Sequence, residues 1–178
     1  MSDFSILKSE VDNGLLGLNS GLPMGFHRLN RYIGIRKRIY SLIFGSTGSG
    51  KSSFVHSAYI LNPYDWYISQ AGKRSGIKFK VFLFSMERSK VYTLAKWVSR
   101  RIFLDHGKII QVPKMLGWWD QKMDKDEHDL FMMYEDYLNE MTENTVTIIE
   151  GAQNPTAFYK IVKEYAERNG RVEDLTAY

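Results

Sequence analysis

The stretch Gly45-Ser46-Thr47-Gly48-Ser49-Gly50-Lys51-Ser52 decides the fold, because it matches the pattern G-x-x-x-x-G-K-[ST] at every fixed position. The apolar run 39–44 precedes it and is typical of a buried strand, whereas the run 53–61 follows it with the composition of a helix. Glycines let the chain turn tightly and approach an anion without Cβ clashes. The pattern therefore predicts a phosphate-binding loop between a strand and a helix N-terminus.

This loop predicts that the chain binds a nucleoside triphosphate. Successive backbone N–H groups and the helix dipole attract a polyphosphate. We expect Lys51 to reach the β- and γ-phosphates, and the Ser52 hydroxyl to complete the Mg²⁺ shell. We assign nucleotide binding to residues 45–52 and to Ser53, which follows them. A glycine- and serine-rich turn can also be a plain connector, but the two flanking runs favour the phosphate site.

Length and composition predict one globular domain without disulfides. The chain has 178 residues, 44% of them hydrophobic and 25% charged, and no cysteine. Neither a signal-peptide stretch nor a run of transmembrane length is present in the sequence, so we expect a cytoplasmic protein with no membrane contact. We divide the chain into a lead-in segment, 1–20, and the N-terminal part of a P-loop ATPase domain, 21–178.

Charge is distributed unevenly. The formal net charge is +4, yet residues 118–150 contain ten acidic residues and two lysines, a local balance of −8 that leaves +12 on the rest. Basic residues crowd at 28–38 and 73–80. Such clusters are typical of nucleic-acid or nucleotide-phosphate surroundings, and equally of a solvated face. Charge alone does not decide between these interpretations.

Strands and helices alternate along the chain. Residues 79–84 and 145–149 are predicted strands, and helices are predicted after Ser89, after Asp124 and after Asn154. Glu127 completes a capping-box-like pair with Asp124, and Pro155 occupies a first helical position. The alternation predicts an α/β fold with a parallel sheet flanked by helices.

The segments between these elements are predicted to be less regular. Residues 23–35 suggest a short helix, the stretch 62–65 with its proline is expected to stop the helix that follows the loop, and 66–77 reads as a loop. Residues 112–120 are predicted to be irregular. The four histidines lack ligand-like spacing, so we do not expect a zinc site.

Glu87 is the candidate catalytic residue. It lies three residues past Phe84, the last apolar residue of the second predicted strand. Ligands of parallel sheets bind beyond the carboxyl ends of the strands, where the phosphate loop is also expected. A carboxylate there can orient a water in line with the γ-phosphate and accept its proton. The alternative is that Glu87 only stabilises the N-terminus of the next helix.

Three segments together resemble the RecA-like ATPase domain of DnaB-type replicative helicases, in particular phage members. They are residues 23–30 (PMGFHRLN), the loop 45–52 and residues 82–89 (FLFSMERS). The resemblance spans roughly residues 21–170. It implies a RecA-like P-loop NTPase fold, ATP with Mg²⁺, single-stranded DNA as a partner and a homohexameric ring. It also implies that Glu87 and Lys51 are catalytic, with Glu87 as the base.

The resemblance further implies elements that the sequence does not contain. A Walker B aspartate, a polar sensor and an arginine finger have no counterpart before Tyr178, so we expect the N-terminal part of a longer ATPase domain. Residues 146–150 end in Glu150 and have the general Walker B shape, but a capped helix follows immediately. We therefore interpret Glu150 as the end of an edge strand.

Two alternative functions remain open. One is a recombinase-like ATPase or a small-molecule kinase of the same P-loop class. The other is a non-catalytic nucleotide-binding fragment or scaffold, which the missing Walker B strand favours. DNA-stimulated hydrolysis would distinguish the helicase from a kinase.

Overall fold

The computed structural model describes residues 2–16, 19, 21–36, 39–75, 77–151 and 154–169. The described residues form an α/β structure of many helices and a two-stranded parallel sheet. The chain divides into two compact units, residues 1–79 and 80–178, and each is described by itself. The α/β class and the parallel strands predicted from the sequence are confirmed.

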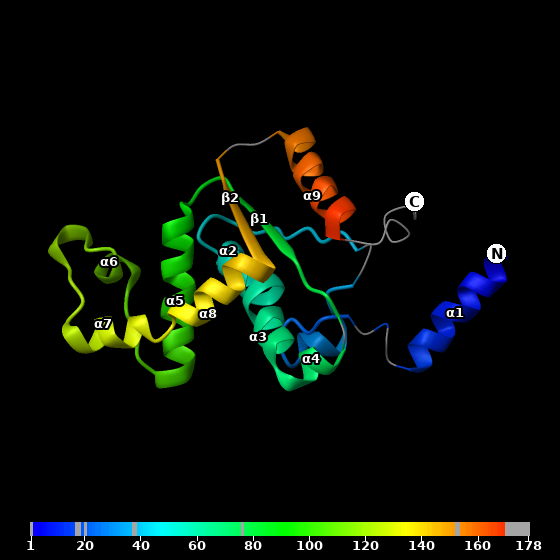
Figure 1. Ribbon diagram of the computed structural model, residues 1–178, viewed down its shortest axis with the longest axis horizontal. Helices are drawn as coiled ribbons and strands as arrows, with labels where there is room; N and C mark the ends of the chain where they lie inside the picture. Colours follow the sequence, from blue (N-terminus) through cyan, green and yellow to red (C-terminus); the bar gives the residue numbers. More distant parts are fainter. Residues whose placement is uncertain are drawn as a thin grey trace. The chain divides into compact units, whose positions relative to one another are not determined.

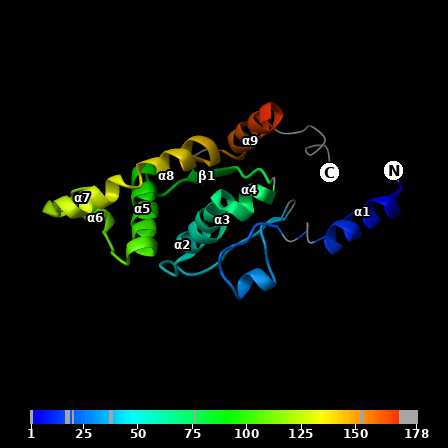
Figure 2. The same cartoon turned by 60° about the horizontal axis from the view of Figure 1, so that its bottom comes forward.

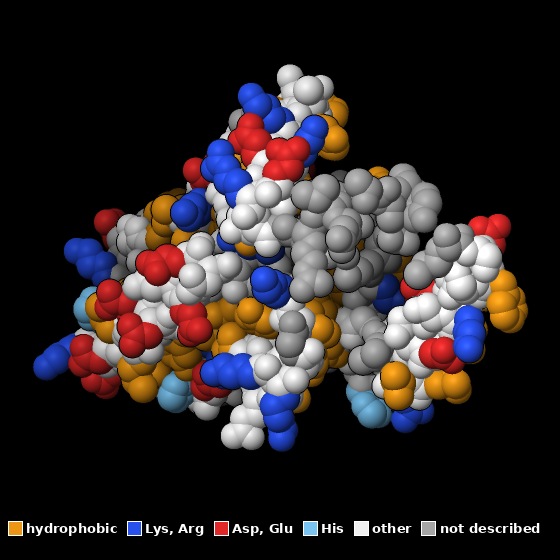
Figure 3. Space-filling model, turned by 45° about the vertical axis from the view of Figure 1, so that its right-hand side comes forward, with side chains coloured by type: hydrophobic (Ala, Val, Ile, Leu, Met, Phe, Trp, Pro, Cys, Tyr) orange, Lys and Arg blue, Asp and Glu red, His pale blue; other side chains and the backbone are white. Residues whose placement is uncertain are grey.

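The first unit begins with helix α1 (Asp3–Leu15), in a region where the sequence lacks clear periodicity. The Ser2 hydroxyl caps this helix by accepting the N–H of Ser5 at 3.3 Å. The side chains of α1 are exposed or half-buried, and large apolar ones appear on its surface in Figure 3. A helix that buries so little draws its stability from local capping and hydrogen bonds rather than from packing.

A nearly continuous helical run follows the phosphate loop (Figure 2). It consists of α2 (Lys51–Val55), the π-helical segment η3 (His56–Leu61) and α3 (Asn62–Ile68). The predicted stop at 62–65 is therefore wrong, since the chain stays helical through Pro63. Proline lacks an N–H and cannot complete an ordinary i→i−4 bond, and the wider π-turns before it change the hydrogen-bond register at that point.

The predicted loop 66–77 is also mostly helical. After Ser69 the chain forms α4 (Gln70–Ser75), and the Ser69 hydroxyl accepts the N–H of Gly72 at 3.3 Å. Gly72 is buried, and a Cβ atom at this position would collide with the carbonyl oxygens of Trp66 and Tyr67. The glycine that suggested a loop instead allows two helices to pack closely.

Residues 39–44 do not form the predicted strand. The segment has no regular secondary structure, and Tyr40 and Phe44 are each 84% exposed instead of buried. A strand exists only through hydrogen bonds to a neighbour, and the described residues provide none for this segment. Apolar composition alone therefore did not produce a strand here.

The segment before it is anchored to the helical run. Leu22 and Ile35 form an isolated antiparallel bridge, and the expected helix at 23–35 is reduced to one 3₁₀ turn, η2 (Leu29–Arg31). The buried Met24 accepts a hydrogen bond on its carbonyl from the Asn62 side chain at 2.8 Å. Phe26 stacks on Phe54 at 5.5 Å between ring centroids.

The second unit contains the sheet, in which β1 (Val81–Ser85) pairs in parallel with β2 (Val146–Glu150) (Figure 1). The register places Val81 opposite Val146 and Ser85 opposite Glu150. Helix α9 (Pro155–Asn169) covers the strands through two aromatic pairs, Phe82–Tyr165 and Phe84–Phe158. The predicted strands 79–84 and 145–149 are thus confirmed to within two residues.

The remaining helices of the second unit surround a small apolar core. They are α5 (Lys90–His106), α6 (Val112–Met115), the 3₁₀ turn η4 (Trp118–Asp120), α7 (Lys125–Met132), α8 (Glu135–Glu140) and the π-helical segment η5 (Met141–Thr145). The core consists of Val98, Ile102, Ile110 and Tyr134. Residues 112–120, predicted to be irregular, contain the short helices α6 and η4.

The predicted helix starts in this unit are confirmed. The Ser89 hydroxyl accepts a hydrogen bond from the N–H of Tyr92 at 3.2 Å. The side-chain oxygen Oδ1 of Asn154 accepts one from the N–H of Ala157 at 2.7 Å. Asp124 and Glu127 form both bonds of a capping box. These starts were predictable because caps are local bonds that need no tertiary partner.

Candidate nucleotide-binding site

The phosphate loop has the backbone shape that its glycines permit. Gly48 has φ +79° and Gly50, the N-cap residue of α2, has φ +85°. Residues with a Cβ atom rarely adopt this left-handed region. A Cβ atom built at either glycine would meet open space, so both positions leave room for a ligand to approach the main chain.

Lys51 folds over the loop. Its ammonium group donates hydrogen bonds to the carbonyl oxygen of Gly45 at 2.7 Å and to that of Ser46 at 2.6 Å. The side chain is therefore held against the loop, with its charge at the concave side of the turn formed by residues 45–50. The amide of Ser49 donates to Ser46 at 3.2 Å and closes this turn.

The amides of the loop are available to a ligand. Residues 45–50 are exposed, and in the described part of the chain the N–H groups of Gly48 and Gly50 donate to no backbone acceptor. The first N–H groups of the helical run that begins at Lys51 also lack intrahelical partners, as at every helix start. Unpaired N–H groups and a lysine ammonium around one turn can bind an anion.

The other assigned loop residues lie around the same turn. Thr47 is in the turn itself, and Ser52 and Ser53 are exposed in the first turn of α2. The structure therefore brings together the predicted residues of segment 45–53. It does so without the preceding strand, since 39–44 is irregular.

Glu87 belongs to the second unit, whereas the phosphate loop belongs to the first. It lies in the bend Met86–Arg88 that directly follows β1, and its side chain is exposed. The bend is held by the Ser85 hydroxyl, which donates to the carbonyl oxygen of Arg88 at 2.5 Å. Its place after the strand agrees with the position predicted from the sequence.

Glu150 ends strand β2, as the sequence predicted, and has a structural role that sequence reasoning missed. Its carboxylate accepts a hydrogen bond from the N–H of Lys90, the first residue of α5. A carboxylate at this position satisfies one unpaired amide and interacts favourably with the helix dipole. Nothing in the local sequence signals the contact, because sixty residues separate the two partners.

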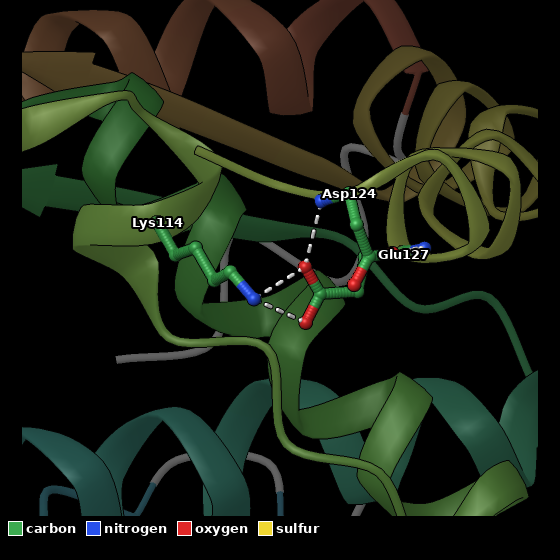
Figure 4. Close-up of polar contacts among 3 residues, drawn as sticks. All are labelled: Lys114, Asp124 and Glu127. Atoms are coloured by element: carbon green, nitrogen blue, oxygen red, sulfur yellow. Dashed lines mark hydrogen bonds and ion pairs between the residues drawn. The ribbon is translucent and has the colours of Figure 1, made fainter. Parts of the chain in front are cut away.

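Two polar clusters of the second unit were also missed. In Figure 4 the Lys114 ammonium approaches the buried Glu127, with a distance of 2.6 Å to Oε2, and the N–H of Asp124 donates to the same carboxylate at 3.0 Å. The hydrogen bond from Lys114, followed by that from Asp124, holds the pKa of Glu127 below its ordinary value of 4.5. The interaction fixes α6 against the start of α7.

The second cluster lies beside the apolar core. The Tyr134 hydroxyl donates to Asp105 at 2.8 Å, and Arg101 donates to the same carboxylate at 2.8 Å. Burial and then the bond to Asp105 raise the pKa of Tyr134 to about 12. For Asp105, burial favours a higher pKa, but the bonds from Tyr134 and Arg101 outweigh it and lower the pKa.

Two findings concern ligand and membrane contacts of the described residues. Within those residues, groups of three or more His, Asp or Glu side chains suited to hold a metal ion are not found. Of the helices that the structure describes, none is both long and apolar enough to cross a bilayer.

Comparisons with known proteins find no family model, no curated protein and no solved structure that matches this chain.

Proposed function

We propose that this chain is an ATP-binding and ATP-hydrolysing motor module of the RecA-like P-loop class, related to DnaB-type replicative helicases. The observation that carries the proposal is the complete motif at 45–52, together with its two left-handed glycines and the lysine folded over the turn. A connector needs neither a lysine at that position nor exposed amides around it. A phosphate site needs both.

The loop residues fit ATP with Mg²⁺. The amides of Gly48 and Gly50 belong to an exposed turn, where a β-phosphate would replace solvent. A polyphosphate would compete with the carbonyl oxygens of Gly45 and Ser46 for the ammonium of Lys51. The exposed Ser52 hydroxyl is the expected protein ligand of Mg²⁺, and the ion supplies charge neutralisation between the β- and γ-phosphates.

Glu87 is the proposed general base of hydrolysis. Its exposed carboxylate follows a parallel strand, at the edge where ligands of such sheets bind. It would accept the proton of the water that attacks the γ-phosphorus, while the bond from that phosphorus to the bridging oxygen of ADP breaks. Glu150 is a weaker candidate because its carboxylate already caps α5.

The wider assignments follow from the resemblance alone. They are DNA unwinding coupled to hydrolysis, single-stranded DNA as partner and a hexameric ring. The cytoplasmic location is an expectation from the sequence itself. One observation favours a second candidate, a nucleotide-binding module without turnover. Segment 39–44 has no regular secondary structure and is mostly exposed, so the loop lacks the strand that usually delivers it to the sheet.

Nucleotide binding is tested with a fluorescent ATP analogue, with and without Mg²⁺. We expect Lys51→Ala to weaken binding about 10- to 150-fold, because hydrogen bonds to a charged group contribute about 1.5–3 kcal/mol. Lys8→Ala is the matched control, since Lys8 is an exposed lysine of α1 in the same unit and lies outside both basic clusters. Equal affinity in the Lys51 variant and the control would refute the phosphate site.

Hydrolysis is tested by phosphate release in the presence and absence of single-stranded DNA. Glu87→Gln is expected to bind the analogue normally and to release no phosphate above background. Glu135→Gln, an exposed acid of α8 in the same unit, is the control and should match the unmodified chain. If the unmodified chain binds nucleotide but releases no phosphate under any condition, the module without turnover is the correct function.

A further inference from the structure

We propose that the turn Trp118–Asp120 and the basic pocket beside it form a second ligand site, which binds a single strand of nucleic acid by stacking a base on Trp119 and holding a neighbouring phosphate. The site lies entirely in the second unit and does not depend on the nucleotide site at 45–53. Four observations carry the proposal: the backbone of the turn, the ladder of aromatic rings, the lysines of the pocket and the engagement of the nearby acids.

The backbone of the turn is unusual. Trp119 has φ +52° and Asp120 has φ +60°, and within the described residues these are the non-glycine positions with positive φ. A bulky residue in the left-handed region is a real outlier, and such strain concentrates at binding and catalytic sites. Here the strained turn presents an indole ring that is 76% exposed. Packing does not explain the arrangement, because the ring that the turn positions is mostly in solvent.

Three aromatic rings contact one another in series, and we call them the aromatic ladder: Tyr92, Trp118 and Trp119. Trp119 is the last ring of this series. Its centroid lies 5.8 Å from that of Trp118, with the planes at 74°. Trp118 stacks on Tyr92 at 5.9 Å and 17°, and the Arg88 guanidinium lies 4.6 Å from the Tyr92 ring. Trp118 thereby contacts both Tyr92 and Trp119, and the exposed indole of Trp119 meets the Trp118 ring edge to face. Stacking on such rings accepts any base, because every base has a π-face.

Residues that flank this turn in the sequence line a basic pocket. Gly117, directly before the turn, and Lys122, two residues after it, line a cavity of about 420 Å³. The charged and titratable side chains of the cavity wall are Lys114, Lys122, Lys125, His128 and Asp124. A phosphate next to a base stacked on Trp119 would meet the lysines of this wall.

Three of the acids around the pocket already have partners. Asp124 accepts the N–H of Glu127 at 2.8 Å, and Glu127 forms the ion pair with Lys114. Asp129 lies 3.8 Å from His128, and Asp120 and Asp126 are exposed nearby in the sequence. In the described part of the chain, Lys122 and Lys125 form no ion pair with an acid. Two cations are thus left for an anionic group of the ligand.

The combination favours a nucleic-acid single strand over an apolar peptide. An aromatic corner alone would suit a proline-rich segment, which needs no cations. A nucleotide unit has a base that can stack on the exposed indole and a phosphate that can contact the unpaired lysines. A duplex buries its bases and would use only the lysines, so a preference for single strands is the signature of the site.

The test is fluorescence anisotropy of a labelled poly-dT oligonucleotide of about 12 nucleotides, a length within the range of single-strand sites. We expect Trp119→Ala to weaken binding about 5- to 150-fold, which is the cost of one lost base stack. Lys122→Gln should weaken binding moderately and reduce the slope of log affinity against log salt by about 1. A duplex of the same length should bind more weakly than the single strand.

Trp119→Gly separates a binding role from a structural one. Glycine adopts φ +52° without strain, so this variant should melt at or above the temperature of the unmodified chain and still lose binding like Trp119→Ala. Tyr159→Ala and Lys160→Gln are the matched controls: Tyr159 is 65% exposed beside Lys163 on α9 of the same unit, and Lys160 is an exposed lysine of that helix. Neither control should change affinity.

Three results would overturn the proposal. Unchanged affinity in both Trp119 variants would remove the stacking platform, and equal affinity for duplex and single strand would remove base recognition. Binding of a proline-rich peptide with the same dependence on Trp119, in place of the oligonucleotide, would assign the turn to a peptide. The oligonucleotide is titrated without ATP, so the site can be confirmed even where the proposed nucleotide function fails.

Discussion

The phosphate loop of the first unit and the helical core of the second unit are built in opposite ways. Residues 45–50 are exposed and are held by a few local bonds, mainly from Lys51 to the carbonyl oxygens of Gly45 and Ser46. The core around Ile102 is closed, and Tyr134 and the buried Glu127 are tied to partners on other helices. The proposed phosphate contacts of the loop and the tight packing of this core thus involve different parts of the chain.

This difference predicts which variants should lower stability and which should weaken ligand binding. An exposed loop that keeps its amides unpaired can bind a ligand but contributes little to folding. A packed core resists volume changes because its atoms have nowhere to move. Variants of the core should therefore lower stability and spare ligand binding, and variants of the loop should do the reverse.

The largest effect on stability is expected for Ile102→Ala. Ile102 is fully buried in the core, and truncation to alanine removes apolar contacts and leaves a cavity, at a cost of about 2–5 kcal/mol in the free energy of unfolding. Urea denaturation measures the change. Val91→Ala, an exposed aliphatic residue of the same helix, is the control and should change stability by less than about 0.5 kcal/mol. A loss of nucleotide binding in folded Ile102→Ala would contradict the separation of the two regions.

A second effect concerns alkaline pH. The pKa of Tyr134 is raised from 10.0 to about 12 by burial and by its bond to Asp105, so the folded state keeps the proton that the unfolded state loses. The contribution to stability is fully present below pH 10 and is lost as pH rises from 10 through 12. Thermal melts across this window should show a steeper loss for the unmodified chain than for Tyr134→Phe. Parallel curves for the two proteins would show that Tyr134 titrates normally.

The smallest effect is expected for Asp124→Ala, which removes the capping box of α7. Loss of an N-cap side chain costs about 1 kcal/mol, seen as a lower urea midpoint. Asp126→Ala removes an acid from the first turn of the same helix but leaves the cap intact. It should lower the free energy of unfolding by about a few tenths of a kcal/mol. Equal effects of the two substitutions would show that the helix dipole, not the cap, stabilises this end.

Local signals predicted much of the second unit. The caps at Ser89, Asp124 and Asn154 and the strands 79–84 and 145–149 are confirmed, since each depends on neighbouring residues or on a strong apolar run. The same reasoning failed at residues 39–44, at Pro63 and at Gly72. Their structure depends on a partner strand, on π-turns and on close helix packing, and the local sequence contains none of these.

The candidate site shows the same division. The residues of the phosphate loop were predictable because the motif is contiguous, and the structure places them around one turn. The role of Glu150 at the start of α5 and the bond from Asn62 to Met24 were not predictable, since sixty and thirty-eight residues separate the partners. No sequence motif indicated that the rings of Trp118 and Trp119 form part of the aromatic ladder.

The sequence by itself determined the α/β class, the helix starts and the glycine-rich motif at 45–52, because all three depend on short-range patterns and on the conformational freedom of glycine. Only the tertiary structure decided which apolar segments pair as strands, which acids become helix caps, and that an indole at position 119 is held in solvent by a strained turn. These outcomes depend on contacts between residues far apart in the chain, whose free energy no local pattern contains.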